Sequence, residues 1–134
     1  MNKLTGRIAA IQCNSHMSLV DVVIGSDTLS ATLLETPEVA EYLKIGNRVS
    51  LLFKETEVSL AKNLTGLISL RNRFAVTVRS IERGDILSAV VLDYAGKTLT
   101  AVITTRGMDR LQLAIGDEVE ALVKANEMAL SYDL

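Results

Sequence analysis

The chain repeats itself once, and this repeat constrains the possible folds more than any other feature of the sequence. The segment Ile45-Gly46-Asn47-Arg48-Val49 has a counterpart 70 residues later in Ile115-Gly116-Asp117-Glu118-Val119. Other short segments match at the same offset, and the residues between them are similar in character. The sequence therefore predicts two copies of one small unit, with a first domain over residues 1–64 and a second over residues 65–134.

Apolar residues within each copy recur mostly at every second position, which is typical of β-strands. Four strands are predicted from this pattern in each copy, and a fifth short strand is expected to complete each unit. The eight segments cover residues 6–12, 19–24, 28–34, 48–53, 75–81, 87–92, 98–104 and 118–123. Matching the copies in this way requires a local register slip of two residues, because Val22-Val23-Ile24 aligns best with Val90-Val91-Leu92.

One short helix is expected in each copy between the third and fourth strands. Thr36-Pro37 is a helix-start signal, since threonine is a favourable N-cap and proline suits the first helical position. This helix must end before Gly46, and residues 106–113 are the equivalent stretch in the second copy. Five short strands and one short helix per copy predict a mostly β protein made of two small OB-like β-barrels in tandem.

Composition and charge exclude several classes of protein. With 14 Lys+Arg, 16 Asp+Glu and only 4% aromatic residues, the chain lacks the basic, ring-bearing surface typical of nucleic-acid binding. Its longest apolar runs are four residues, whereas a membrane-spanning helix needs about 20. No secretory leader is visible at the start, and the single cysteine cannot form an internal disulfide. We therefore expect no membrane span and a cytoplasmic location.

The residue types that usually carry catalysis or bind metals are scarce. Cys13 and His16 are the single cysteine and the single histidine, and they lie three positions apart in a polar turn. A zinc site built on them would lack a second ligand pair. No acid and base residues with suitable spacing are apparent either. We therefore expect no resident metal, no organic cofactor and no enzymatic activity.

Four short motifs, in order along the second copy, resemble the Mop family of TOBE-type molybdate-binding domains, the molbindins. Units of that family begin with Ser-Ala-Arg-Asn before a strand, and this chain has Ser69-Leu70-Arg71-Asn72 there. They end on a strand followed by Lys-Ala-Ser/Thr/Pro, where Lys124-Ala125-Asn126 stands. Ala101-Val102-Ile103-Thr104 resembles the family's Ala-x-Ile-Thr strand end, and residues 113–119 its Leu-x-x-Gly-x-x-Val stretch. The resemblance extends over both copies.

The resemblance implies an oxyanion-binding protein that stores, buffers or delivers molybdate or tungstate. A tetrahedral dianion leaving water must be surrounded by donors, because burying an unpaired charge is costly. The expected oxyanion-binding residues of the second copy are Ser69, Arg71, Asn72, Thr104, Lys124, Ala125 and Asn126. The first copy has no residues at the Ser and Arg positions, so only Lys54 and Thr56 are candidates there. Glu55 and Glu57 beside them would repel a dianion.

The proportion of apolar residues indicates an interface. A chain of 134 residues with 49% hydrophobic residues has more apolar surface than two very small cores can hide. We expect the two barrels to pack together and the chain to form a homo-oligomer through its sheet edges. The alternative is a monomer with one double-sized core. The resemblance implies a trimer with anion sites at the interfaces between units.

Two other functions remain open from the sequence. An OB-like barrel can bind single-stranded nucleic acid, and the basic residues Arg71, Arg73, Arg79 and Arg83 favour that function. A module that has lost its ligand and now serves interaction or regulation is the second alternative, suggested by the carboxylate of Glu55 beside the expected site.

Overall fold

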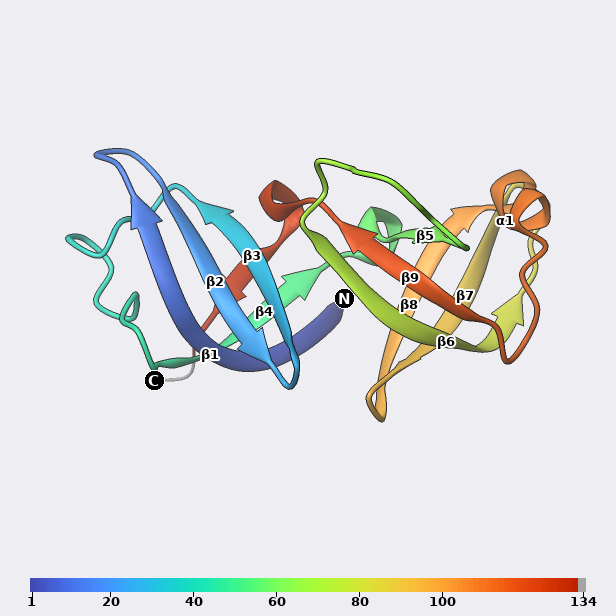
Figure 1. Ribbon diagram of the computed structural model, residues 1–134, viewed down its shortest axis with the longest axis horizontal. Coiled ribbons are helices and arrows are strands. Elements are labelled where there is room, and N and C mark those ends of the chain that lie inside the picture. Colours follow the sequence, from blue (N-terminus) through green and yellow to red (C-terminus); the bar gives the residue numbers. More distant parts are fainter. Residues whose placement is uncertain (133–134) are drawn as a thin grey trace.

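The computed structural model describes residues 1–132 as two five-stranded antiparallel sheets that lie end to end (Figure 1). The strands are β1 (Asn2–Cys13), β2 (Ser18–Ile24), β3 (Asp27–Leu33), β4 (Arg48–Phe53), β5 (Ser59–Ala61), β6 (Asn72–Glu82), β7 (Leu87–Tyr94), β8 (Lys97–Thr104), β9 (Glu118–Val123) and β10 (Ala129–Ser131). One α-helix, α1 (Thr105–Leu111), and two single 3₁₀ turns, η1 (Glu55–Glu57) and η2 (Ala125–Glu127), are the helical elements of this range. The expected mostly β fold of two tandem OB-like units is confirmed.

Each sheet receives its fifth strand from the other repeat. The strand order is β10-β4-β1-β2-β3 in the first sheet and β5-β9-β6-β7-β8 in the second. Leu60 of β5 lies opposite Ala121 of β9, and Leu130 of β10 lies opposite Leu51 of β4. In Figure 1, β5 therefore sits on the second unit although it precedes the linker, and the chain after η2 runs back to the first unit. Neither unit completes its sheet with its own residues.

The two repeats are equivalent at an offset of 70 residues through their hairpins, so the expected register slip is wrong. Ile8 pairs with Val22, and Val78 pairs with Leu92 at the same offset. Both long first strands carry a bulge directly after this pair. The slip was suggested by runs of similar β-branched residues, which match almost equally well in either register. In the structure the alternation of buried side chains decides the register.

The helix expected in the first repeat is also wrong, because the segment before β4 forms hydrogen-bonded turns. The Ala40 N–H donates to the Thr36 carbonyl at 2.9 Å and the Leu43 N–H to the Ala40 carbonyl at 3.2 Å, and the ladder does not continue. In the second repeat, where α1 forms, the Thr104 hydroxyl accepts a bond from the Gly107 N–H at 3.0 Å. Within residues 1–132 the Thr36 hydroxyl caps no such N–H group. A short helix depends on this bond, because its first N–H groups have no partner inside the helix.

Buried side chains from both sheets form one connected core. Leu4 and Leu51 represent the first sheet and Phe74 and Leu92 the second, and each is no more than 2% exposed. The two edges of each sheet also approach one another, β10 against β3 and β5 against β8, so each sheet curls toward a barrel. Within the described range, no helix is long and apolar enough to cross a membrane.

Two asparagine side chains join the sheets at the boundary between them, which we call the seam. The Asn72 side chain donates to the Ser30 carbonyl at 2.8 Å and accepts from the Ser30 N–H at 2.7 Å. Asn2 makes the same pair of bonds with Thr100, at 2.8 and 2.9 Å. Ser30 and Thr100 lie on β3 and β8, the edge strands, whose outward backbone groups would otherwise lack partners.

Candidate functional site

A shallow depression of about 250 Å³ lies at the seam, where the segment before β6 and the turn η2 meet β3. Its lining residues are Thr32, Ser69, Leu70, Arg71, Lys124, Ala125 and Asn126. Five of these seven are residues that the sequence analysis expected to bind an oxyanion, brought together from two distant stretches of the chain. Thr32, which belongs to the first repeat, was missed. No motif marked it, because its place in the site depends on how the two repeats pack.

The two cations of this depression are not neutralised by carboxylates. Within residues 1–132, Arg71 and Lys124 form no ion pair, although both side chains are exposed. The other arginines of the same basic cluster are all paired. Their partners are Glu120 for Arg73, Asp93 for Arg79 and Asp109 for Arg83. Among residues 1–132, no carboxylate lines the depression, so its positive charge is available to an anion.

Two of the paired arginines, Arg73 and Arg83, keep their carboxylate partners ionised. Hydrogen bonds from Arg73, at 2.9 and 3.0 Å, lower the pKa of Glu120. Hydrogen bonds from Arg83, at 2.7 and 2.8 Å, lower the pKa of Asp109. Since these charges are balanced locally, little of the basic cluster remains to track a nucleic-acid backbone, and that alternative is not favoured.

The donors around the depression suit a small, fully deprotonated oxyanion. Ser69 and Thr32 carry hydroxyl groups, Asn126 carries an amide, and Arg71 and Lys124 bring charged N–H donors. Hydrogen bonds from charged donors to an anion are roughly twice as strong as neutral ones. The half-buried Leu70 and Ala125 complete the lining with apolar surface.

Two expected residues do not line this depression. Asn72 is 1% exposed, and both ends of its side-chain amide are bonded to Ser30, so it anchors the segment that carries Arg71. Thr104 lies at the far end of β8, where its hydroxyl caps α1. Within one chain, Asn72 therefore positions the depression, and Thr104 is remote from it.

The equivalent locus of the first repeat has a different charge. Lys54 and Thr56 are exposed at η1, which packs against β8. The carboxylate of Glu55 lies 2.5 Å from the Met1 ammonium, whose hydrogen bond lowers the pKa of Glu55. Glu57 accepts a bond from the Lys54 N–H at 3.0 Å. Two carboxylate side chains thus stand where an incoming dianion would have to bind.

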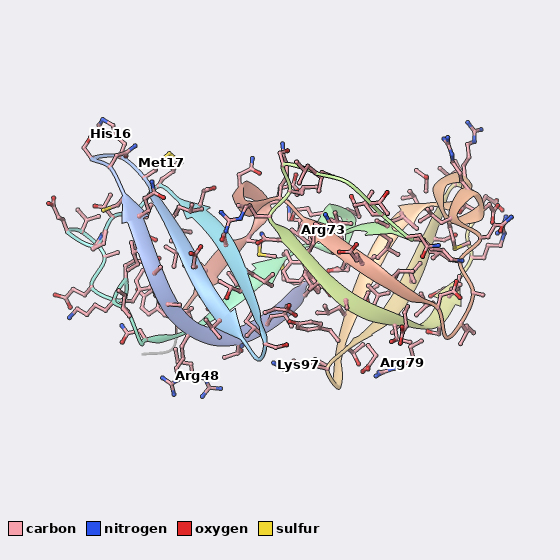
Figure 2. The ribbon with its side chains drawn as sticks, viewed as in Figure 1. His16, Met17, Arg48, Arg73, Arg79 and Lys97 are labelled. Atoms are coloured by element: carbon pink, nitrogen blue, oxygen red, sulfur yellow. The ribbon has the colours of Figure 1, made fainter. Side chains whose placement is uncertain are left out.

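The turn that holds Cys13 and His16 has a structural role. The Asn14 side chain accepts bonds from the N–H groups of His16 and Met17, at 2.8 and 2.9 Å, which closes a tight turn. Figure 2 shows His16 and Met17 at the outer tip of the first sheet, far from the seam. Cys13 is exposed and forms no disulfide.

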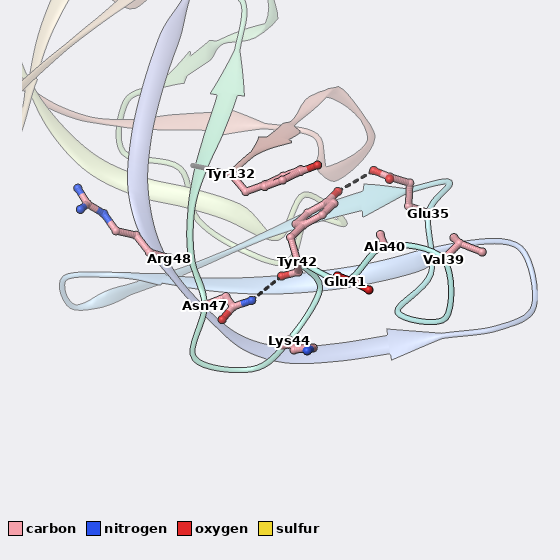
Figure 3. A pocket seen from close by; sticks show the side chains of 9 residues that line it. All are labelled: Glu35, Val39, Ala40, Glu41, Tyr42, Lys44, Asn47, Arg48 and Tyr132. Carbon is pink, nitrogen blue, oxygen red and sulfur yellow. Dashed lines mark hydrogen bonds between the residues drawn. The ribbon is translucent and has the colours of Figure 1, made fainter. Parts of the chain in front are cut away.

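A larger depression of about 670 Å³ lies at the outer end of the first sheet (Figure 3). The rings of Tyr42 and Tyr132 stack there with their centroids 4.0 Å apart. The Tyr42 hydroxyl donates to Glu35 at 2.6 Å, and burial together with this bond raises the pKa of Tyr42. Asn47 also donates to the Tyr42 carbonyl at 3.0 Å. These contacts fasten Tyr132, which directly follows β10, to the first unit, and the lining mixes both signs of charge.

The sequence of this chain is similar to a known domain family and to several characterised proteins. Residues 68–130 match the TOBE domain family. The molybdenum transport protein ModE of Herbaspirillum seropedicae is 35% identical over 127 residues, which cover 92% of this chain and 47% of ModE. The molybdenum-pterin-binding protein MopB of Rhodobacter capsulatus is 39% identical over 101 residues, covering 69% of this chain and 37% of MopB. The chain spans less than half the length of these curated relatives.

A solved structure matches the whole fold. The crystal structure of ModG, described as a cytoplasmic molybdate-binding protein and determined with molybdate bound, superimposes with a TM-score of 0.91. The sequences are 27% identical, and the match covers 98% of this chain and 96% of ModG. The tandem arrangement of the two units is therefore common to both proteins.

Proposed function

Because the chain belongs to the Mop group of TOBE-type proteins, we propose that it binds molybdate or tungstate and stores, buffers or delivers the anion in the cytoplasm. One observation carries the proposal. The seam depression combines neutral donors with two cations that have no carboxylate partner among the described residues 1–132. A depression of this chemistry favours a compact dianion. The chain acts as a binding protein and catalyses no reaction.

Five of the seven lining residues have a role in the proposed site. Arg71 and Lys124 supply the positive charge, and Ser69 and Asn126 donate neutral hydrogen bonds to the remaining oxygens. Ala125 leaves room for the anion where the first repeat has a glutamate. Lys54 and Thr56 form at most a weaker locus, because Glu55 and Glu57 repel a dianion. Thr104 would reach an anion only across a contact with another copy of the chain.

We propose that the chain assembles into a homo-oligomer, with a trimer as the expected form. Large apolar side chains are exposed at matching positions of the two repeats, Ile45 at 71% and Ile115 at 70%. Leu34 is 86% exposed and Leu67 is fully exposed. Apolar surface of this extent on a small chain favours an interface. Assembly would also bring donors from a second copy to the exposed side of each seam depression.

Calorimetric titration with molybdate in excess sulfate tests the function, with the assembly state fixed by light scattering. The parent protein should show saturable binding and a higher melting temperature with molybdate, because a ligand of the native state stabilises it. Arg71→Ala should weaken binding at least about tenfold, since it removes a charged donor. Arg106→Ala is the matched control, because it removes the same charge from an exposed position on α1. Absence of both heat and stabilisation in the parent would overturn the proposal.

A further inference from the structure

The outer edge of β3 directs backbone groups away from β2, and Asn72 satisfies only those of Ser30. Alternate residues of an antiparallel strand bond to the partner strand, and the residues between them direct N–H and C=O to the other side. The Ser30 N–H and C=O point away from β2, because Asn72 binds both. Thr32 lies two residues further along β3, so its N–H and C=O point to the same side. Within residues 1–132, the Thr32 N–H makes no backbone hydrogen bond to a turn, a loop or another sheet. The strand that pairs with β3 is β2, on the opposite side.

The side chain of Thr32 lines the same depression. It is half-buried, and it is the lining residue that the first repeat contributes. The other donors, among them Ser69, Arg71 and Lys124, all belong to the second repeat. An anion held by these donors alone would have no donor on its side toward the first sheet. Thr32 stands on that side with a hydroxyl and an N–H group on one residue.

We propose that Thr32 is a ligand of the bound oxyanion, donating its hydroxyl and its backbone N–H from the edge of β3. This inference rests on the proposed function. A tetrahedral dianion requires donors from several directions, and a strand edge without a paired neighbour offers N–H groups that need no rearrangement to bind. The site is therefore shared by both repeats, and the motif residues of the second repeat form only part of it.

The equivalent locus, where η1 packs against β8, provides an internal comparison within the same chain. Val102 of β8 stands at the position equivalent to Thr32, and Glu55 stands at the position equivalent to Ala125. The locus that carries the Glu55 carboxylate thus also lacks a threonine hydroxyl, because Val102 stands there. The two differences occur together, as expected if the threonine binds an anion at the seam depression and no anion binds at the equivalent locus.

Calorimetry of Thr32 variants tests the hydroxyl. Thr32→Val keeps the shape of the side chain and the backbone N–H, and it should weaken molybdate binding about tenfold or more. Thr32→Ser should restore most of the affinity. Val102→Thr, the opposite change at the equivalent position, should leave the affinity within about twofold of the parent. Urea unfolding of each variant establishes that the fold is intact.

Amide spectra of a ¹⁵N-labelled sample test the backbone donor. Titration with molybdate should move the Thr32 N–H resonance strongly and slow its hydrogen exchange, while that of Val102 stays in place. If the parent binds molybdate but Thr32→Val binds equally well and the Thr32 resonance does not respond, the inference is overturned and the proposed function stands. If the parent binds no molybdate, the proposed function fails as well.

Discussion

The side-chain amide of Asn72 bonds to both backbone groups of Ser30, so that a residue of one sheet completes the strand edge of the other. Ser30 lies on β3, and Asn72 is the first residue of β6. Because Arg71 directly precedes Asn72, the same contact holds its cation beside β3 and Thr32. The contact that joins the two sheets thus also forms the wall of the proposed anion site.

Replacing Asn72 with alanine should destabilise the protein by about 2–4 kcal/mol, because the Ser30 N–H and C=O would both lose their partner. Urea unfolding measures this change. Asn2→Ala should have a similar effect through Thr100, which makes the same two bonds. A loss below about 0.5 kcal/mol for Asn72→Ala would mean that water satisfies Ser30 and that the bond does not hold the seam.

Separating the repeats should change their assembly, because each sheet takes its fifth strand from the other repeat. In a fragment of residues 65–134, β9 would lack β5 and its own β10 would lack β4. Two copies can satisfy both by placing β10 of each on β9 of the other, so we expect a dimer by light scattering. A stable, folded monomer would show that the exchange is dispensable and that residues 65–134 fold as an independent domain.

Stability at acid pH should depend on Asp117. Its carboxylate accepts bonds from the Ala114 N–H at 2.9 Å and from Lys62 at 3.0 Å, and these contacts lower the pKa of Asp117 from 3.8. The stabilisation is therefore present above pH 3.8 and is lost as the pH falls through the lower pKa of the folded state. Asp117→Asn, which copies Asn47 of the first repeat, should lose less stability between neutral pH and about pH 2.

Melting temperatures of the parent and Asp117→Asn across this pH range measure the effect. Other paired carboxylates, such as Glu120 and Asp109, contribute equally to both proteins, so the difference between the two curves isolates Asp117. Parallel curves would contradict the prediction. At neutral pH the two proteins should differ little, since Lys62 is at the surface and exposed ion pairs contribute at most about 1 kcal/mol.

Phosphate should bind at least about tenfold more weakly than molybdate. Near neutral pH, hydrogen phosphate carries a proton that needs an acceptor, whereas molybdate offers acceptors only. In the part of the chain that the structure describes, the seam depression has no carboxylate to accept this proton. Lowering the pH toward 6 should widen the difference, because phosphate then gains a second proton. Displacement of molybdate by an equal concentration of phosphate, measured by competition calorimetry, would contradict this account of the site.

The sequence predicted most of the local structure correctly. Alternating apolar residues placed eight strands close to their observed bounds, because that pattern is set by which side chains face the core. The motif residues of the second repeat, such as Arg71 and Lys124, do line one depression. The first-repeat helix was wrong, since Thr36 and Pro37 are start signals that do not guarantee the capping bond. The three-residue strands β5 and β10 were not located, because so short a segment has no period to detect.

By itself, the sequence determined that this protein consists of two equivalent β units and which residues of the second unit carry the motifs from which anion binding is proposed. Only the tertiary structure decided that the units exchange their last strands and that Thr32 lines the same depression as Arg71. Strand pattern is local, because it depends on the alternation of neighbouring side chains. Which segment pairs with a sheet edge is not decided locally, because any free edge offers the same backbone groups. The packing of the two sheets selects the segment that pairs with each edge.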